Sequence, residues 1–323
     1  MRKGQCNGVD SMYHIVKIKS IIDFLEKNNY SFSFHGNECS EIKGFSTLFN
    51  YKETTITLIS KMYNFEDYIH LFKGRKIRLI ITDTSESIFD CFENVIQIEK
   101  PTNAFFGILD EFYSDNSIRN NSITNNINEF KKNSFISDQA VVGKNVKIGV
   151  GCVIEPDVYI GDNTEIHHNV VIKSKTTIGN NCTIYSGTII GERGFNPLTL
   201  EDHSRKLLNH YGGVTIMDNV HIGDNCCISK GSIDDTIIGE GVKLNKQVIV
   251  AHNVKVGTDT VFTAPTFVCG SVVIGEKCHI AASVIKNQCK VGDKSILGLG
   301  SVVIKDVEAG ITVVGNPAKS LEK

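Results

Sequence analysis

The stretch of sequence best suited to chemistry lies between residues 228 and 254, where polar side chains interrupt an otherwise apolar pattern. His252 stands two positions after the apolar Val250, so we expect its imidazole to face away from a hydrophobic core. Asparagine, aspartate and glutamine can orient a histidine as a general base, although a lone histidine is more often an ordinary surface residue. The polar residues of this stretch are Asp234, Asp235, Asn245, Lys246, Gln247, His252 and Asn253. We interpret His252 as the candidate base.

Other residues give weaker indications of chemistry. His203 and His210 fall in a segment that departs from the surrounding pattern and could reach a substrate, whereas His167 and His168 have no carboxylate at a ligand-like spacing. A metal site needs three convergent ligands, and the sequence shows neither such a set nor a C-x-x-C pair. We therefore predict no metal, and we interpret the 10 cysteines as reduced structural thiols of a cytoplasmic protein.

A period of six residues predicts the elements that must position His252. A helix has a period near 3.6 and a half-buried strand a period of 2, so neither fits. A chain that turns a corner every six residues would close a triangular coil of about 18 residues. The aliphatic residues at this spacing are Ile136, Val142, Ile148, Ile154, Ile160, Ile166, Ile172, Ile178, Ile184 and Ile190. We predict a mainly β fold, a parallel β-helix, for residues 135–305.

The repeat has one long interruption, at residues 191–213, and resumes at Ile216 with single-residue shortenings around Ile233, before Ile238 and before Ile285. A segment that leaves a repeat and re-enters it in register must be extruded at a corner, and long ordered loops are usually functional. Residues 306–323 form a C-terminal tail, which we expect to fold over one end of the coil.

The part of the chain before the repeat predicts a second domain. Residues 1–115 combine short alternating strands with two helices, one from the spacing of Ile18, Ile21, Ile22 and Leu25 and one introduced by Pro101. This reads as a small α/β domain that caps the other end of the coil. Residues 116–134 are rich in Asn and Ser and indicate a linker.

Composition argues against several classes of partner. The net charge of −2 shows no basic excess for nucleic acid, and no apolar run approaches the roughly 18 residues of a membrane span. The N-terminus lacks the apolar core of a signal peptide. The flat faces of a β-helix favour side-by-side association, so we expect a closed cyclic oligomer.

Four segments carry a resemblance to a known family: 182–195 (CTIYSGTIIGERGF), 212–216 (GGVTI), 230–244 (KGSIDDTIIGEGVKL) and 247–254 (QVIVAHNV). With the order of the parts, they resemble the hexapeptide acyltransferases, and most closely the lipid A pathway UDP-3-O-acylglucosamine N-acyltransferases. The resemblance implies a left-handed β-helix, catalysis by His252, and an N-terminal domain that binds the nucleotide base through Ser60 and Tyr63. Gly194 and Phe195 match the loop that shapes the acyl groove.

The departures from this family are equally specific. The family's second histidine aligns near Gln288, the asparagine of its uracil motif is replaced by Ser60, and the C-terminal helices that receive acyl carrier protein are absent from this sequence. The tail instead resembles that of coenzyme-A-dependent hexapeptide acetyltransferases, which assigns Asn316, Pro317 and Lys319 to the cofactor. Lysine is a suitable partner for phosphates.

The resemblance and its departures predict an acyl-CoA-dependent N-acyltransferase, a homotrimer, acting on a nucleotide-linked amino sugar. The narrower match is the anthrose-pathway enzyme that transfers a 3-hydroxyacyl group to dTDP-4-amino-4,6-dideoxyglucose. Substrate contacts are expected from Asp234, Asp235, Asn245, Gln247 and Asn253 besides the loop and the N-terminal residues. The alternatives are a lipid A N-acyltransferase that uses acyl carrier protein, a non-catalytic scaffold, and a metalloenzyme resembling γ-carbonic anhydrase.

Overall fold

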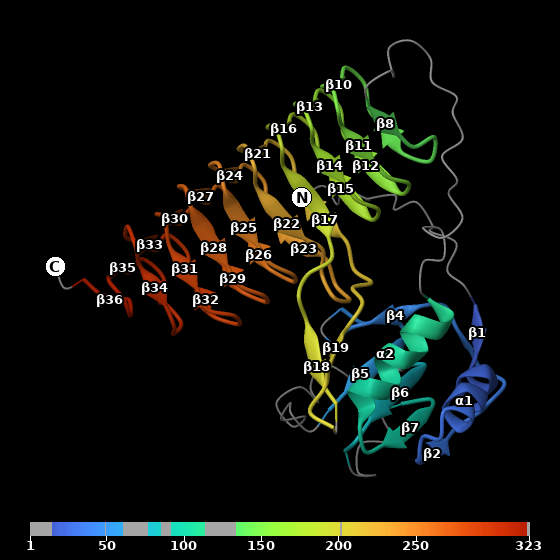
Figure 1. Ribbon diagram of the computed structural model, residues 1–323. Helices are drawn as coiled ribbons and strands as arrows, with labels where there is room; N and C mark the ends of the chain where they lie inside the picture. The colour runs from blue at the N-terminus through green and yellow to red at the C-terminus, as the bar shows by residue number, and fades with distance from the viewer. Residues whose placement is uncertain are drawn as a thin grey trace, which may run out of the picture. The chain divides into compact units, whose positions relative to one another are not determined.

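The computed structural model describes residues 15–48, 50–60, 77–84, 92–113, 134–200 and 202–321. The chain forms two compact units, Met1–Ser122 and Ile123–Lys323, which are described separately below (Figure 1). Neither of the two described helices is long and apolar enough to cross a membrane.

The first unit is built on a five-stranded sheet. Its strand order is β2-β7-β6-β5-β4, with β2 antiparallel to β7 and the other neighbours parallel. Both helices expected from the sequence are present, and Ile18, Ile21, Ile22 and Leu25 form the buried face of the first. The elements are β1 (Val16–Lys17), α1 (Ile18–Lys27), β2 (Phe32–His35), β3 (Glu41–Ile42), β4 (Phe45–Ser46), β5 (Ile56–Ile59), β6 (Leu79–Thr82), β7 (Val95–Ile98) and α2 (Pro101–Phe112).

The second unit is the parallel β-helix, whose coils stack into three sheets (Figure 1). The nine-stranded sheet holds β8 (Phe135–Ile136), β11 (Val153–Ile154), β14 (Val171–Ile172), β17 (Ile189–Glu192), β22 (Cys227–Ser229), β25 (Val248–Val250), β28 (Thr266–Val268), β31 (Val284–Ile285) and β34 (Val302–Val303). The eight-stranded sheet holds β9 (Val141–Val142), β12 (Val158–Ile160), β15 (Thr176–Ile178), β20 (Val214–Ile216), β23 (Thr236–Ile238), β26 (Lys255–Val256), β29 (Val273–Ile274) and β32 (Lys290–Val291).

The ten-stranded sheet completes each coil. It holds β10 (Lys147–Ile148), β13 (Glu165–Ile166), β16 (Thr183–Ile184), β21 (His221–Ile222), β24 (Lys243–Leu244), β27 (Val261–Phe262), β30 (His279–Ile280), β33 (Ile296–Leu297), β35 (Thr312–Val314) and β36 (Lys319–Ser320). The tail ends this sheet, because β35 pairs with β33 and then turns back to pair antiparallel with β36. Between β17 and β20 the chain leaves the coil in a loop that contains the hairpin of β18 (Pro197–Thr199) and β19 (Arg205–Leu207).

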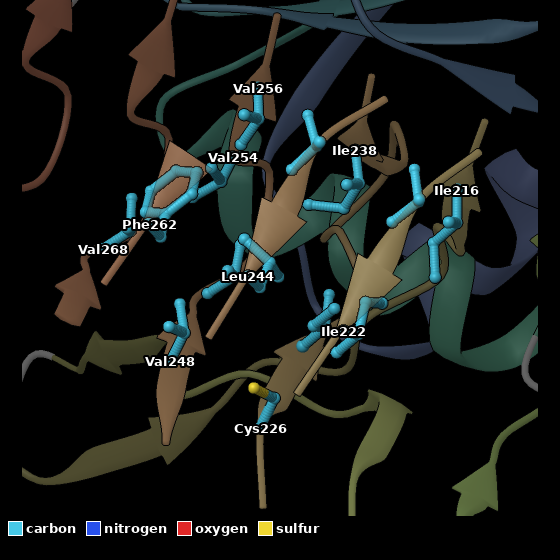
Figure 2. Packing of buried hydrophobic residues seen from close by; sticks show 14 of the residues in the cluster. Ile216, Ile222, Cys226, Ile238, Leu244, Val248, Val254, Val256, Phe262 and Val268 are labelled. Carbon is cyan, nitrogen blue, oxygen red and sulfur yellow. The ribbon is translucent and has the colours of Figure 1, made fainter. Parts of the chain in front are cut away.

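The six-residue aliphatic positions fill the interior of the β-helix. Ile216, Ile238 and Val256 of the eight-stranded sheet face Ile222, Leu244 and Phe262 of the ten-stranded sheet across the coil (Figure 2). The first coil differs from this expectation, since Val142 is 38% exposed and Ile136 and Ile148 are only partly buried. Its strands pair with a neighbouring coil on one side only, so these side chains lack a second layer.

Candidate functional site

One edge of the β-helix collects most of the residues of interest. We call it the loop corner: the turns that connect each strand of the nine-stranded sheet to the eight-stranded sheet. The extruded loop leaves after β17 and returns at β20, so it belongs to this corner. The later turns of the same corner contain Asp234, His252, Gly270 and Gln288 in successive coils.

Asn253 determines the tautomer of His252. The Asn253 amide nitrogen Nδ2 donates to the carbonyl of Asp234 (3.1 Å), and its Oδ1 accepts the backbone N–H of Ser232 (3.0 Å). Oδ1 also lies 3.0 Å from His252 Nδ1. Because an amide oxygen can only accept, Nδ1 must carry the proton, and Nε2 is left with a free lone pair. The amide predicted to contact substrate is thus engaged by the protein, and it prepares His252 to accept a proton.

The absence of a side chain at Gly270, one coil further along, leaves room for the His252 ring. A Cβ atom at position 270 would lie 2.7 Å from His252 Nε2 and 2.8 Å from Cε1. Real Cβ atoms do not approach so closely, so a side chain at position 270 would displace the ring. The sequence pattern did not single out Gly270, although a coil length of about 18 residues places it beside His252.

The extruded loop contributes a second histidine. The ring centroid of His210 lies 5.2 Å from that of His252 at an interplanar angle of 68°. His210 is only 5% exposed, and neither ring nitrogen makes a hydrogen bond of good geometry within the described structure, although the Leu208 backbone lies close to the ring. Gly194, at the start of the loop, touches both rings, since a Cβ there would lie 3.0 Å from His210 Nε2 and from His252 Cδ2. Sequence reasoning identified His210 only as a loop residue able to reach a substrate.

Acid is expected to destabilise the protein through His210. Burial of the ring, and then the charge of nearby His252, lower the pKa of His210 from 6.5 to about 4. Between these values the unfolded chain binds a proton that the folded protein does not, so stability is full above 6.5 and falls toward 4. The free energy of unfolding is therefore lower by roughly 2 kcal/mol near pH 5 than at neutral pH. The acid-induced fall in Tm should be smaller in His210→Leu than in the wild type, and equal falls would contradict the assignment.

Asp235 anchors the returning limb of the loop. One carboxylate oxygen accepts the backbone N–H of Gly213 (2.7 Å) and the other accepts the hydroxyl of Thr215 (2.7 Å). Tyr211, just before this limb, is also held by hydrogen bonds. Its N–H donates to the carbonyl of Ser232 (2.8 Å), and its carbonyl accepts a hydrogen bond from Lys175 Nζ (3.2 Å). Asp235, predicted as a substrate contact, therefore holds in place the segment that carries His210.

Removing the Asp235 carboxylate should loosen this segment. Asp235→Ala leaves the N–H of Gly213 and the hydroxyl of Thr215 without their acceptor, at a cost of about 1–3 kcal/mol. We expect a lower Tm together with a lower rate of the reaction proposed below. Asp202→Ala is the matched control, because Asp202 accepts its hydrogen bonds from the N–H and hydroxyl of Ser204 in an exposed turn. Equal Tm values for the two variants would disprove the anchoring role.

Two predicted residues lie elsewhere on the coil. Asn245 and Gln247 are exposed at the corner between β24 and β25, whereas His252 follows β25. The structure therefore places them at a different corner from His252, and their expected contact with the substrate stays a prediction. Phe195 belongs to the loop and is 75% exposed, and Gln288 lies on the loop corner two coils beyond His252.

The predicted cofactor residues lie at the end of the stack. Asn316, Pro317 and Lys319 are exposed, and Lys319 lies in β36, the last strand of the ten-stranded sheet. Five strand spacings separate β36 from β24, the strand of the His252 coil in that sheet, which is about 24 Å along the stack. An extended donor would be needed to contact both places.

The first unit presents a separate candidate site at the carboxyl ends of its parallel strands. Ser60 follows β5, Asp83 follows β6 and Glu99 follows β7, and ligands of open α/β sheets bind at such edges. Ser60 Oγ donates to Asp83 Oδ2 at 3.5 Å. Tyr63 lies outside the described residues. A hollow of about 380 Å³ opens here, lined by Ser31, Phe32, Asp83, Gln97, Ile98 and Glu99.

The described residues include candidates for metal and thiol chemistry. Among those residues there is no group of three or more His, Cys, Asp or Glu side chains that could hold a metal ion. The eight cysteines described are all free, and burial raises the pKa of the Cys226 thiol to about 11. The expectation of a metal-free site stays a prediction.

The repeat itself matches a known family of sequences. Residues 139–174 fit the family model described as bacterial transferase hexapeptide (six repeats). A UDP-3-O-acylglucosamine N-acyltransferase of Bordetella parapertussis is 40% identical over 97 residues, which are 30% of this chain and 27% of that protein. The corresponding protein of Hahella chejuensis is 51% identical over 73 residues, or 23% and 21% of the two chains. The chain thus spans about a quarter of the length of these relatives.

Solved structures resemble the hexapeptide β-helix. LpxA from Acinetobacter baumannii is 29% identical with a TM-score of 0.53, covering 59% of this chain and 72% of that one. LpxA from Bacteroides fragilis, a UDP-N-acetylglucosamine acyltransferase, is 27% identical with a TM-score of 0.53, covering 59% and 72%. The predicted fold class, a left-handed parallel β-helix, is confirmed.

Proposed function

We propose that this protein is an acyl-CoA-dependent N-acyltransferase that acylates the amino group of a nucleotide-linked sugar. The observation that carries this proposal is His252, whose Nε2 is freed by the hydrogen bond between Nδ1 and Asn253. Relatives named UDP-3-O-acylglucosamine N-acyltransferases share part of the chain, which supports a nucleotide sugar as acceptor. The tail residues Asn316, Pro317 and Lys319 favour coenzyme A. Ser60 and Gln288, which stand where the lipid A enzymes have an asparagine and a second histidine, favour a dTDP-4-amino-4,6-dideoxy sugar with a 3-hydroxyacyl donor.

The proposed reaction needs alignment more than activation, because a neutral amine is already a nucleophile. The amine nitrogen forms a bond to the thioester carbonyl carbon, and the resulting tetrahedral intermediate loses a proton to His252 Nε2. The C–S bond then breaks, and the thiolate of coenzyme A leaves and takes up a proton. General-base help of this kind gives about 10²–10⁴-fold in rate. The nucleotide would bind at the strand ends that present Ser60 and Asp83.

The outer face of the nine-stranded sheet supports the proposed homotrimer. Each strand of this sheet presents an apolar residue outward, although Glu192 and Ser229 follow at the ends of β17 and β22, whereas the other two sheets carry lysine, threonine and histidine at such positions. Large exposed apolar faces on soluble domains mark association surfaces. The outward residues are Phe135, Val153, Val171, Ile189, Cys227, Ile249, Phe267, Val284 and Val302. The loop corner borders this face, so association would bring a second copy close to His252.

A matched pair of valines tests this surface. Val284 on the nine-stranded sheet and Val273 on the eight-stranded sheet are each 41% exposed and face outward. Val284→Asp should convert the trimer to monomers, because association would bury an unpaired carboxylate, while Val273→Asp should leave it intact. Size-exclusion chromatography with light scattering measures the mass of each variant. Trimers of both variants would place the interface elsewhere.

The proposed activity is tested with a panel of substrates. Purified protein is incubated with nucleotide-linked amino sugars and acyl-CoAs of different length, and release of free thiol is followed. Turnover of a dTDP-4-amino sugar with a short or 3-hydroxyacyl-CoA supports the proposal. Turnover only of UDP-3-O-acylglucosamine with acyl carrier protein would assign the lipid A reaction instead. No turnover of any pair would favour a non-catalytic scaffold, and turnover that depends on added metal would favour a metalloenzyme.

A further inference from the structure

The segment that carries His210 is fixed more firmly than a surface loop requires. The N–H of Leu208 donates to the carbonyl of Asn196 (3.0 Å), and the N–H of Gly212 donates to that of Gly231 (3.1 Å). Leu208 and Tyr211, on either side of His210, are each only 6% exposed. With the bonds of Tyr211 and Gly213 already described, hydrogen bonds hold the main chain on both sides of His210, whose ring packs against that of His252.

The side chain in this rigid frame is nevertheless unsatisfied. A neutral imidazole has one N–H donor and one lone pair, and both nitrogens of His210 are buried without a hydrogen bond of good geometry in the described structure, although the Leu208 backbone lies close to the ring. An unpaired buried polar group costs stability, and each such group in a native protein requires an explanation. An apolar side chain of the same size would fill this space without that cost. Packing against His252 is therefore an insufficient reason for a histidine at this position.

The surroundings of His210 suit a hydrogen bond to a reacting oxygen. Its ring contacts the ring of His252, which in the proposed reaction accepts the proton of the attacking amine. As the amine bonds to the thioester carbonyl carbon, the carbonyl oxygen becomes negatively charged. Gly194 is partly exposed, and a Cβ atom there would lie 3.0 Å from both His210 Nε2 and His252 Cδ2, so Gly194 brings main chain without a side chain close to both rings.

We propose that His210 donates a ring N–H hydrogen bond to the carbonyl oxygen of the acyl donor, as a neutral imidazole. As the amine nitrogen bonds to the carbonyl carbon, the C=O electron pair moves to oxygen and the His210 hydrogen bond strengthens without transfer of its proton. When the C–S bond breaks, the electrons return to the carbonyl and the thiolate leaves. This inference rests on the acyl transfer proposed above and adds a second catalytic residue to it.

Three variants isolate the hydrogen bond from the packing. His210→Leu keeps a side chain of similar volume without nitrogens, and His210→Gln keeps an N–H donor. His203→Asn changes an exposed histidine of the same loop whose φ of 62° asparagine tolerates. Each is compared with the wild type for kcat and KM of thiol release, using the best donor and acceptor of the panel, and for Tm near neutral pH.

We expect His210→Leu to lower kcat by about 10²–10³-fold with little change in KM, the effect of losing one donor to an oxyanion. His210→Gln should recover to within about tenfold of the wild type, because its amide retains a donor. The Tm of His210→Leu should equal or exceed that of the wild type, and His203→Asn should match the wild type throughout. An effect confined to KM, or equal losses in the Leu and Gln variants, would overturn the proposal.

The Tm comparison separates this proposal from the proposed function. If the wild type acylates no member of the panel, the proposed function fails. The Tm values of the two apolar variants, His210→Leu and His210→Phe, still show whether the ring nitrogens of His210 have a structural partner. A marked fall in Tm for both would show that the nitrogens have a structural partner, and the inference is then overturned. An unchanged or higher Tm in either variant supports nitrogens held unpaired for a ligand.

Discussion

Replacing His252 with alanine should lower the rate of acyl transfer by about 10²–10⁴-fold. The variant loses the nitrogen that accepts the amine proton, while the Asn253 amide keeps its bonds to Asp234 and Ser232. The backbone of the turn should therefore keep its conformation. Thiol release under saturating donor and acceptor measures the effect. A loss smaller than about tenfold would mean that the departing thiolate takes the proton itself, and His252 would no longer be the base.

His279→Ala is the matched control for this substitution. His279 is another histidine of the β-helix, exposed on the outward face of β30 in the ten-stranded sheet. It lies away from the loop corner, so its loss should leave kcat and KM within about twofold of the wild type. A comparable loss in both variants would indicate a general effect of removing histidines rather than a specific role of His252.

A single methyl group at position 270 should be nearly as damaging as the loss of the His252 ring. Gly270→Ala places a Cβ atom 2.7 Å from His252 Nε2, so the ring must rotate away from its bond with Asn253. Misplacing a catalytic group by about 1 Å costs on the order of 10²-fold. We expect this loss in kcat, together with a lower Tm, because an overfilled site costs about 1–3 kcal/mol.

The double variant shows whether Gly270 acts through His252. In the His252→Ala background the new methyl group meets no ring, so Gly270→Ala should cost neither further activity nor stability. The coupling energy between the two sites then approaches the whole effect of Gly270→Ala. If the methyl group destabilises the protein equally in both backgrounds, it acts on the coil itself, and Gly270 is then a structural residue only.

The fold of the second unit could be predicted because one physical rule repeats in every coil. An inward aliphatic residue is required wherever a strand faces the interior, and Ile154 to Ile190 obey this rule with complete burial. The rule weakens at the first coil, where Val142 has no second layer of strands to cover it. The helix of Ile18, Ile21, Ile22 and Leu25 was predictable for a similar reason, since its apolar face follows the helical period.

The site was predicted less completely, because closeness in sequence and closeness in space differ in a coil. Asn245 and Gln247 are near His252 in the chain but lie at another corner, whereas Gly270 is a full coil away and touches its ring. The partners of Asn253 and Asp235 depend on backbone groups that carry no signal in the sequence. The contact of His210 with His252 depends on how a loop of 191–213 returns, which no periodicity describes.

The site around His252 lies in the middle of the stack of coils, where unfolding should reach it last. In a linear array each coil is stabilised only by its neighbours, so opening begins at the two ends. The strand order of the nine-stranded sheet places β17, β22, β25 and β28 in its interior, with three strands beyond β17 and two beyond β28. Terminal coils can therefore fray while the coils around His252 remain closed. Amide hydrogen exchange should be slowest in these central coils, and catalysis should outlast the first loss of β-structure on heating.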